Sequence, residues 1–506
     1  MNLSENLRKS VEAYPDQRAY VYLGEQKTYR EFNDEVNRLA NSLQALGITQ
    51  GSKVALILPN SAEFLIAYYA LIRTGAVVIP INPMYKPDEA AYILQDGEVE
   101  ALISIPQLLP VLDAVKPRVP TLKNLILTGS ESIPGYLSFN QLLQQGSPEF
   151  SGPALGEDDV AVILYTSGTT GKPKGAMLTQ KNLTSNVEST IEFTQITSAD
   201  RIICVLPMFH VFCMTVCMNL SVAIGGLLVI LPRFTPQDVV TAIKENQATM
   251  FAGVPTMYTF LLNFPGAAKE DLASLRLSVS GGAPLPLEVL GSFEAKFGKA
   301  ISEGYGLSES SPVCTFNPIG KGKPGSIGIN FPGVINKVVD ENDNELPVGQ
   351  VGELIVKGPN VMKGYFKLPE ATAEAMRGGW LHTGDMAKMD EDGYFYIVDR
   401  KKDLILVGGY NVYPREVEEV VYQIPQVLEA AVVGLPDPQF GEAVKAVISL
   451  KSGQQLTAEE VINFCSGRLA KYKVPKVVEI WPELPKNSTG KILRRELRNL
   501  NLDKEQ

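Results

Sequence analysis

A polar loop between two short apolar runs is the segment of this sequence best suited to chemistry. The loop, YTSGTTGKPKG at residues 165–175, holds four serine or threonine hydroxyls, three glycines and two lysines, and it contains no acid. It follows the run VAVIL and precedes AML, which predicts a strand, a loop and a second strand. Hydroxyls, glycine amides and ammonium groups together suit the oxygens of a polyphosphate.

The same loop has two other interpretations, a P-loop and a plain solvated turn. A P-loop requires a glycine five positions before Gly171, where this chain has Thr166, and a hydroxyl after Lys172, where it has Pro173. The P-loop pattern therefore fails at both positions. A solvated turn also collects Gly, Ser, Thr and Pro, but the interleaved lysines and the lack of acids favour phosphate binding.

Two further polar segments follow predicted strands, SGGAPL at residues 280–285 and EGYGLSES at residues 303–310. In open α/β sheets, ligands bind beyond the carboxyl ends of strands, so these two loops could face each other. Tyr305 lies between two glycines and offers an aromatic face to a base, with a core tyrosine as the plain alternative. Glu309 offers a carboxylate for Mg²⁺, with a solvated loop acid as its alternative.

Charged residues nearer the C-terminus are also candidates. Asp385, in WLHTGD, could accept both hydroxyls of a ribose or could be only a turn acid. Arg400 and Lys402, in DRKKD, precede a predicted new domain, where charged residues are usually part of a linker. Lys491 follows a glycine in the polar stretch PKNSTGKI, where a surface lysine is the default interpretation.

The composition limits the class of protein. With 506 residues, 45% of them apolar and 20% charged, the chain is long enough for two or more domains with large cores. The net charge of −10 argues against nucleic acid as a partner, because a phosphate backbone attracts a basic face. Five cysteines without C-x-x-C spacing, and an N-terminus without an apolar core, predict a reduced, cytoplasmic protein.

One uncharged segment has the length of a membrane span. No Asp, Glu, Lys or Arg occurs between Arg201 and Arg233. However, Pro207 and His210 interrupt the start of the segment, and a Gly-Gly pair splits its end. We therefore predict a strand, a buried helix over residues 211–224 and another strand, and no transmembrane segment.

The elements that would position these residues alternate between helix-like and strand-like runs. YREFNDEVNRLANSLQALG leads to VALILP, SAEFLIAYYALIRTG leads to AVVIPI, and a second such series runs from residue 201 to about residue 303. Continuous apolar strands that alternate with helices predict an α/β fold with two doubly wound sheets. Residues 317–358 are rich in Gly and Pro and predict a small β-barrel-like unit, and residues from about 403 onward predict a separate α+β unit.

Seven segments, taken in order, resemble one family. YTSGTTGKPKG, PMFH, EGYGLSE, GELIVKG, WLHTGD, DRKKDLILVGGY and PKNSTGK resemble the adenylate-forming superfamily of acyl-CoA synthetases, luciferases and peptide-synthetase adenylation domains. The resemblance covers nearly the whole chain, and GYNVYPREVEE and FAGVPTMY are similar to the bacterial long-chain fatty-acid–CoA ligase group. It implies that a carboxylate and ATP, with Mg²⁺, form acyl-AMP and pyrophosphate, and that the thiol of CoA then displaces AMP.

The resemblance assigns nucleotide contacts residue by residue. Lys491 would bridge the attacking carboxylate and the α-phosphate through its positive charge, Ser308 would contact the α-phosphate, and Glu309 would hold Mg²⁺. Asp385 would bind the ribose hydroxyls, and Arg400 would contact ribose or phosphate. The β- and γ-phosphates would be held by Thr166, Ser167, Gly168, Thr169, Thr170, Gly171 and Lys174. Adenine would be bound by Gly281, Gly282, Ala283, Glu303, Gly304 and Tyr305.

A domain organisation with two working orientations is also implied. An adenylation domain at residues 1–399 would bind ATP and the acyl substrate, and a hinge at residues 400–402 would include Lys402. A mobile C-terminal domain at residues 403–506 would carry Lys491 and swing between the two half-reactions. In the second orientation, the CoA pantetheine would pass Gly408 and Gly409, whereas Asn411 would touch phosphate in the first.

The segment PMFHVF at residues 207–212 bears on the acyl substrate. Domains that adenylate amino acids usually place an acid in the pocket near this position, and none occurs here, so a medium- or long-chain fatty acid is favoured. His210 resembles the pocket-gate histidine of the family, and a buried, satisfied histidine is its plain alternative. Three further alternatives are an aryl-CoA ligase, another carboxylate–CoA ligase and a catalytically silent lipid- or nucleotide-binding homologue. A monomer or a homodimer, with or without peripheral membrane contact, fits equally.

Overall fold

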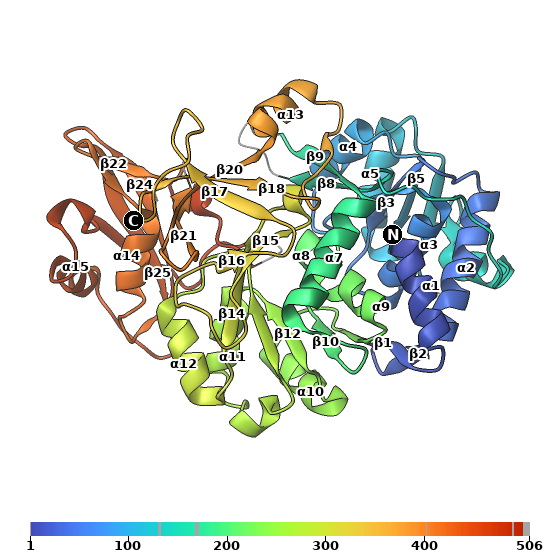
Figure 1. The fold of residues 1–506 in the computed structure, drawn as a ribbon, viewed down its shortest axis with the longest axis horizontal. Helices are drawn as coiled ribbons and strands as arrows, with labels where there is room; N and C mark the ends of the chain where they lie inside the picture. Colours follow the sequence, from blue (N-terminus) through green and yellow to red (C-terminus); the bar gives the residue numbers. More distant parts are fainter. Residues whose placement is uncertain (1, 130–132, 167–171, 401, 488–489, 499–506) are drawn as a thin grey trace.

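Two large mixed sheets, both covered by helices, form most of the molecule (Figure 1). The computed structural model describes residues 2–129, 133–166, 172–400, 402–487 and 490–498. Within these residues the first sheet has nine strands, in the order β16 (Ile329–Asn330), β15 (Val313–Phe316), β14 (Ile301–Gly306), β13 (Leu277–Ser280), β12 (Met250–Gly253), β10 (Arg201–Cys204), β11 (Leu227–Ile230), β1 (Arg18–Tyr22) and β2 (Glu25–Thr28). Its strands from β14 to β1 are parallel.

The second sheet holds the strands on either side of the polar loop. Its described strands number eight, in the order β19 (Gly364–Tyr365), β9 (Lys174–Thr179), β8 (Val160–Thr166), β4 (Val77–Pro80), β3 (Lys53–Ile57), β5 (Ala101–Ser104), β6 (Asn124–Leu127) and β7 (Leu137–Ser138). The strands from β8 to β7 are parallel, whereas β9 and β19 are antiparallel.

These antiparallel edges depart from the parallel sheets that the sequence predicts. β9 turns back on β8 across residues 167–173, and β15 turns back on β14 across residues 307–312. A parallel pairing would need a crossover of a dozen or more residues, which neither connection provides. The α/β fold with two helix-covered sheets is confirmed, and its edges are mixed.

The second sheet is buried on both faces, and successive side chains along its strands point to opposite faces. Val54 and Leu56 of β3 belong to the main core, which also contains Ile202 and Ile203 of the first sheet, so this core fills the space between the sheets. The neighbouring β3 residues, including Ile57, face a second apolar core on the opposite side. Apolar residues at consecutive positions are therefore needed on both faces, as expected for strands buried in a doubly wound sheet.

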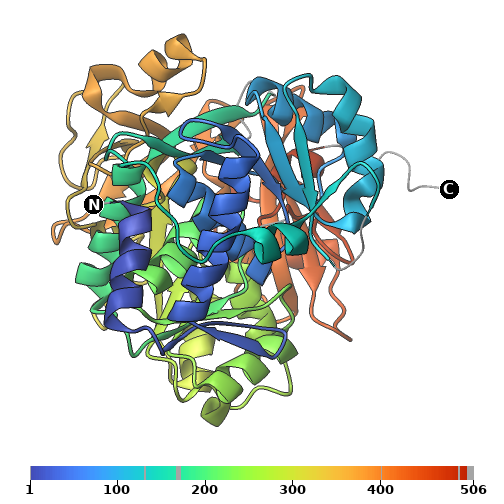
Figure 2. The same cartoon turned by 90° about the vertical axis from the view of Figure 1, so that its right-hand side faces the viewer.

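The helices begin and end at residues that satisfy their free backbone groups. Thr28 accepts a hydrogen bond from the amide of Glu31, whose side chain accepts from the amide of Thr28, and α3 ends at Gly75 with φ of 78°. Figure 2 shows the N-terminal helices, drawn in dark blue, side by side on one face. The helices before residue 400 are α1 (Leu3–Ala13), α2 (Tyr29–Ala45), α3 (Ala62–Thr74), α4 (Pro87–Asp96), α5 (Leu109–Val115), α6 (Phe139–Gln145), α7 (Gln180–Thr194), α8 (Val211–Cys213), α9 (Leu220–Ile224), α10 (Pro236–Asn246), α11 (Pro255–Asn263), α12 (Leu287–Phe297) and α13 (Pro369–Ala375).

The uncharged segment is core, as predicted. It contains β10, a buried helical stretch and β11, and no helix of the described residues is long and apolar enough to cross a membrane. The helical stretch is not uniform, because a π-helical turn at Met214–Asn219 separates α8 from α9. Nothing in the sequence pattern indicated this turn.

Two smaller units complete the chain. A four-stranded antiparallel sheet in the described residues, β17 (Ile335–Val339), β18 (Gly352–Lys357), β20 (Leu381–Met389) and β21 (Phe395–Arg400), has its own small apolar core. Beyond it, residues from Ile405 onward form a separate C-terminal domain with a core of its own. Its elements are β22 (Ile405–Val407), β23 (Tyr410–Val412), α14 (Pro414–Val421), β24 (Val427–Asp437), β25 (Gly441–Leu450), α15 (Ala458–Ser466), β26 (Val477–Ile480) and α16 (Arg494–Leu497).

Candidate functional site

The polar loop joins two paired strands, and its ends lie close together. Thr166, at the end of β8, is the pairing partner of Lys174, at the start of β9. Residues 167–171, which include the predicted phosphate contacts Ser167, Gly168, Thr169, Thr170 and Gly171, lie outside the described residues. The loop therefore opens at the carboxyl end of β8, which is where a doubly wound sheet binds ligands.

Three elements converge on the carboxylate of Glu309. This residue lies in a short 3₁₀ turn, Ser308–Ser310, after β14. Its Oε1 accepts hydrogen bonds from the hydroxyl of Tyr365, at 2.9 Å, and from the hydroxyl of Thr166, at 3.4 Å. The Nζ of Lys174 lies 5.3 Å from the centre of the Tyr365 ring. The structure thus joins the predicted metal ligand to both ends of the predicted phosphate loop.

Tyr365 is a site residue that the sequence interpretation missed. It is on β19, which pairs with β9 and so reaches the phosphate loop from a distant part of the chain. The only sequence signal is the position of this tyrosine after a glycine in KGYFK. A neutral tyrosine far from the other motifs carries no sign of its role, because its neighbours are brought together by sheet pairing.

The predicted adenine residues lie at the ends of two neighbouring strands. Gly281, Gly282 and Ala283 follow β13, whereas Glu303, Gly304 and Tyr305 belong to β14 itself and not, as predicted, to a loop after it. Ser280, before Gly281, is the pairing partner of Glu303, so the ends of β13 and β14 lie side by side. Glu303 is buried, and its Oε1 accepts a hydrogen bond of 3.1 Å from the amide of Leu285 beyond the loop after β13. Burial raises the pKa of Glu303 to about 7, although Arg415 opposes this shift.

Close packing explains why glycine is suited to the loop after β13. A side chain at Gly281 would meet ring carbons of Phe212 at 3.3 Å and the carbonyl oxygen of Gly304 at 3.4 Å. Gly282 has φ of 81°, a conformation that other residues rarely adopt. The absence of a side chain at Gly281 therefore lets this loop pack closely against Phe212 and β14.

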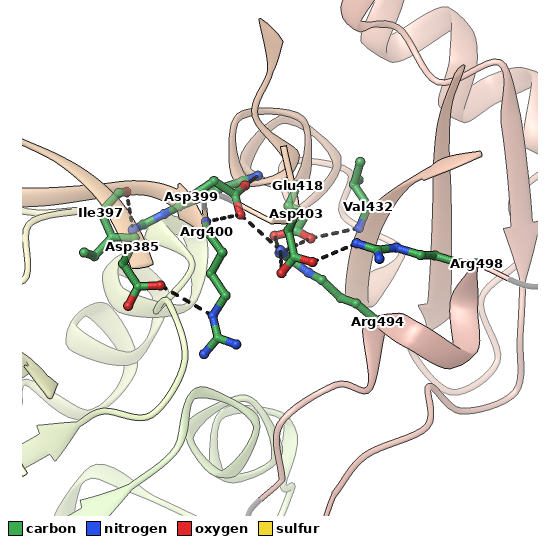
Figure 3. Close-up of polar contacts among 10 residues, drawn as sticks. Asp385, Ile397, Asp399, Arg400, Asp403, Glu418, Val432, Arg494 and Arg498 are labelled. Atoms are coloured by element: carbon green, nitrogen blue, oxygen red, sulfur yellow. Dashed lines mark hydrogen bonds and ion pairs between the residues drawn. The ribbon is translucent and has the colours of Figure 1, made fainter. Parts of the chain in front are cut away.

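Tyr305 and Asp385 are directly hydrogen bonded. The Tyr305 hydroxyl donates to Oδ2 of Asp385 at 2.6 Å. The Nε of Arg400 lies 3.5 Å from Oδ1 of Asp385 (Figure 3). Asp385 and Arg400 face each other as a pair across β20 and β21. The structure thus places the residues predicted for adenine, ribose and phosphate contact in one cluster.

Lys491 comes from the C-terminal domain to this cluster. The carbonyl oxygen of the preceding Gly490 accepts a hydrogen bond of 3.2 Å from the Thr256 hydroxyl on α11, which ties the segment to the larger domain. Burial and the positive charge of Arg400 lower the pKa of Lys491 to about 8, against the opposing effect of Asp385. The charges of Asp385 and Arg400 therefore both act on Lys491.

His210 is within the electrostatic influence of Lys491. It caps the start of α8, and its Nδ1 accepts a hydrogen bond of 3.3 Å from the amide of Phe212. Burial and the positive charge of Lys491 together lower the pKa of His210 to about 4. His210 is therefore neutral near pH 7 and contributes no second charge to the site.

The hairpin of β22 and β23 lies elsewhere. The amide of Gly408 donates to the carbonyl oxygen of Phe440 at 2.7 Å, and Tyr410 stacks on Tyr472 with ring centres 4.8 Å apart. These contacts lie inside the C-terminal domain, and Figure 1 places β22 at its outer edge. Among the described contacts none joins Gly408, Gly409 or Asn411 to the cluster, so the roles predicted for these three residues stay predictions.

The fold and the clustered residues define a nucleotide-binding enzyme of two domains, and comparison with known proteins identifies the class. Residues 7–366 match the family described as AMP-binding enzyme, and residues 416–491 match the AMP-binding enzyme C-terminal domain. The chain belongs to the AMP-binding enzyme family.

Relatives with assigned names cover almost the whole chain. A long-chain-fatty-acid–CoA ligase of Bacillus subtilis is 40% identical over 98% of this chain and 94% of its own length. A feruloyl-CoA synthase of Amycolatopsis is 37% identical over 96% of both chains. The ATP-bound MatB of Rhodopseudomonas palustris superposes with a TM-score of 0.91 at 36% identity over 98% of both chains, and the apo form of MatB superposes with 0.81. This chain is therefore an ATP-dependent acyl-CoA synthetase that acts through an adenylate.

Proposed function

We propose that this enzyme activates a medium- or long-chain fatty acid as acyl-AMP and transfers the acyl group to CoA. The names of the fatty-acid relatives support the substrate, and so does the pocket segment, which has a neutral His210 and no acid to receive a second charged group. Each methylene that enters an apolar pocket adds about 0.8 kcal/mol of binding. The proposed compartment is the cytoplasm, and the five cysteines are unpaired and buried.

The position of Lys491 is the observation that carries the proposal. The charges of Arg400 and Asp385 act on Lys491, and the charge of Lys491 acts on His210, which supports a site where the ribose–phosphate part of ATP would meet the carboxylate of the substrate. In the first half-reaction, a carboxylate oxygen attacks the α-phosphorus and pyrophosphate leaves. Both reactants are anions, so a fixed positive charge between them stabilises the transition state most where their charges converge.

The nucleotide contacts follow from the same cluster. The backbone of Gly281, Gly282, Ala283 and Gly304 would bind adenine, Asp385 would accept the ribose hydroxyls, and Arg400 would contact ribose or phosphate. Ser308, next to Glu309, would contact the α-phosphate, and residues 166–171 with Lys174 would hold the β- and γ-phosphates. These roles are supported by the convergence of the ends of β13 and β14, the 3₁₀ turn and β20 at one edge of the sheets.

Mg²⁺ fits the ligands that surround Glu309. Both described hydrogen bonds to the Glu309 carboxylate, from the hydroxyls of Tyr365 and Thr166, go to Oε1. The groups gathered here carry oxygen atoms, which are the ligands that Mg²⁺ prefers. In the described residues no cluster of three or more acidic, His or Cys side chains could hold a metal by itself, so substrate phosphates would complete the coordination. Bound there, Mg²⁺ would neutralise phosphate charge, while Tyr365 and Thr166 hold the Glu309 side chain in place.

The second half-reaction would use another orientation of the C-terminal domain. Lys402 is exposed in the turn between β21 and β22 and is the proposed hinge. Rotation there would withdraw Lys491 and bring Gly408 and Gly409 to the cluster, where the thiol of CoA would attack the acyl carbon and release AMP. The better superposition on ATP-bound than on apo MatB supports the assignment of the present orientation to the adenylation step.

Pyrophosphate release tests this proposal. Straight-chain acids from two carbons upward, together with ferulate, are assayed at saturating ATP with and without CoA. We expect kcat/KM to rise with chain length and to level off or fall where the pocket ends. Highest efficiency with acetate or an amino acid would overturn the fatty-acyl assignment, and highest efficiency with ferulate would favour the aryl alternative that the feruloyl-CoA relative suggests.

A further inference from the structure

A single buried carboxylate joins the two domains. Asp399 is the penultimate residue of β21, three residues before the proposed hinge at Lys402, and it is 5% exposed. Its Oδ1 accepts hydrogen bonds from its neighbour's amide, that of Arg400, at 2.8 Å and from the Nη1 of Arg494 at 3.3 Å. Its Oδ2 accepts a hydrogen bond of 3.1 Å from the amide of Arg415.

Two of these three donors come from beyond the hinge. Arg415 is on α14 and Arg494, labelled in Figure 3, is on α16, and both helices belong to the C-terminal domain. The Arg415 side chain also reaches back to the larger domain, because Nη1 donates to the carbonyl oxygen of Ile397 at 3.0 Å and Nη2 to that of Gly325 at 3.3 Å. Asp399, in the larger domain, therefore accepts a hydrogen bond from the amide of Arg415 and another from the side chain of Arg494.

Arg494 has other partners that would move with it. Its Nη2 donates to both carboxylate oxygens of Glu418, at 2.7 and 2.9 Å, and its Nη1 lies 3.9 Å from Oδ2 of Asp403. Glu418 and Asp403 both follow the hinge, so a rotation at Lys402 would keep these two contacts and break the one with Asp399. Within this network the pair of Asp399 and Arg494 is thus specific to the present orientation.

We propose that Asp399, with Arg494 and Arg415, is a clamp that holds the C-terminal domain in the adenylation orientation and thereby positions Lys491. This inference rests on the proposed swing between two half-reactions. Arg494 is three residues beyond Lys491, and the intervening Leu493 donates its amide to the carbonyl oxygen of Pro485 at 2.8 Å. A short, tethered segment therefore links the clamp to the Lys491 ammonium, and Asp399 acts as a positioning residue.

The charge of Asp399 sets the strength of the clamp. A buried carboxylate that loses its cationic partner is left without compensation for its lost hydration, so breaking the clamp is costly until another group or water reaches Asp399. Asp399→Asn keeps the shape and the ability to accept a backbone hydrogen bond, and it removes the charge. Arg494 is not left unpaired in this variant, because Glu418 remains bound to it.

The two half-reactions, measured separately, test the clamp. In Asp399→Asn we expect acyl-AMP formation, followed as pyrophosphate release without CoA, to be roughly tenfold slower, and transfer from supplied acyl-AMP to CoA to change by less than roughly twofold. Arg494→Gln should likewise slow acyl-AMP formation and leave transfer to CoA nearly unchanged, and Arg494→Lys should retain most of the adenylation rate. The matched control is Asp200→Asn, which removes a buried carboxylate bonded to Arg276 inside the larger domain and should show no split.

A distance measurement reads the orientation without any substrate. Spin labels at Glu270→Cys and Glu459→Cys report the two domains, since both sites are exposed and the five native cysteines are buried. We expect Asp399→Asn to broaden or shift the distance distribution and Asp200→Asn to leave it unchanged. Equal loss of both half-reactions, or an unchanged distribution in Asp399→Asn and Arg494→Gln, would overturn the clamp. If wild-type enzyme releases no pyrophosphate with fatty acids, the proposed substrate fails while the label distances still test the clamp.

Discussion

The depressed pKa of Lys491 predicts how the first half-reaction responds to pH. Its value of about 8, against 10.5 for an ordinary lysine, results from burial and from the charge of Arg400. With this pKa, about 91% of the side chains are charged at pH 7 and about 9% at pH 9. Only the charged form stabilises the transition state, so kcat/KM for acyl-AMP formation should fall about tenfold between these two pH values.

The assay is initial pyrophosphate release without CoA from pH 6.5 to 9.5, at low concentrations of fatty acid so that kcat/KM for the free enzyme is read. Lys491→Arg is the matched control, because arginine stays charged over this range and its rate, although lower, should not fall near pH 8. Lys491→Ala should suppress acyl-AMP formation and largely spare CoA transfer from supplied acyl-AMP. A flat profile in the wild type, or the same decline in Lys491→Arg, would refute the assignment of the required charge to this lysine.

Two further variants test the hinge and the Glu309 site. Lys402→Pro fixes φ near −65°, so we expect adenylation to survive and thioester formation to fall, and normal rates of both steps would place the hinge elsewhere. Tyr365→Phe removes the donor to Oε1 of Glu309, a charged hydrogen bond of about 1.5–3 kcal/mol, and should raise the Mg²⁺ concentration needed for half-maximal pyrophosphate release by roughly tenfold. Tyr92→Phe, whose hydroxyl donates to the carbonyl oxygen of Pro173 beside the same loop, should leave that concentration unchanged.

Much of the fold was predictable because local signals agree with it. Apolar runs of strand length alternate with helices that carry their own caps, such as Thr28 with Glu31, and this pattern predicts two doubly wound sheets. The antiparallel edges were not predicted, because strand direction at β9 and β15 depends on the length of the preceding connection rather than on composition. The π-helical turn at Met214–Asn219 is set by packing inside the core and leaves no pattern of its own.

The candidate site was predictable where its residues lie in dense polar motifs. Glu309 lies in the polar run LSESS, whereas Asp385, Arg400 and Lys491 occur next to a glycine or in a charged run. The structure pairs Asp385 with Arg400, and the charges of both act on Lys491. Contacts made by isolated residues were not predictable. Tyr365 reaches Glu309 only because β19 pairs with β9, and sequence separation hides such a pairing.

The two domains contribute different groups to the proposed site, so the clamp between them can affect the reaction. In the proposed mechanism the larger domain supplies the phosphate and adenine contacts and the Asp385–Arg400 pair, and the C-terminal domain supplies Lys491. Their described contacts around Lys491 are few and polar, such as Thr256 to Gly490, as suits an interface that must open. A buried carboxylate at the hinge can then control which half-reaction occurs without contacting either substrate.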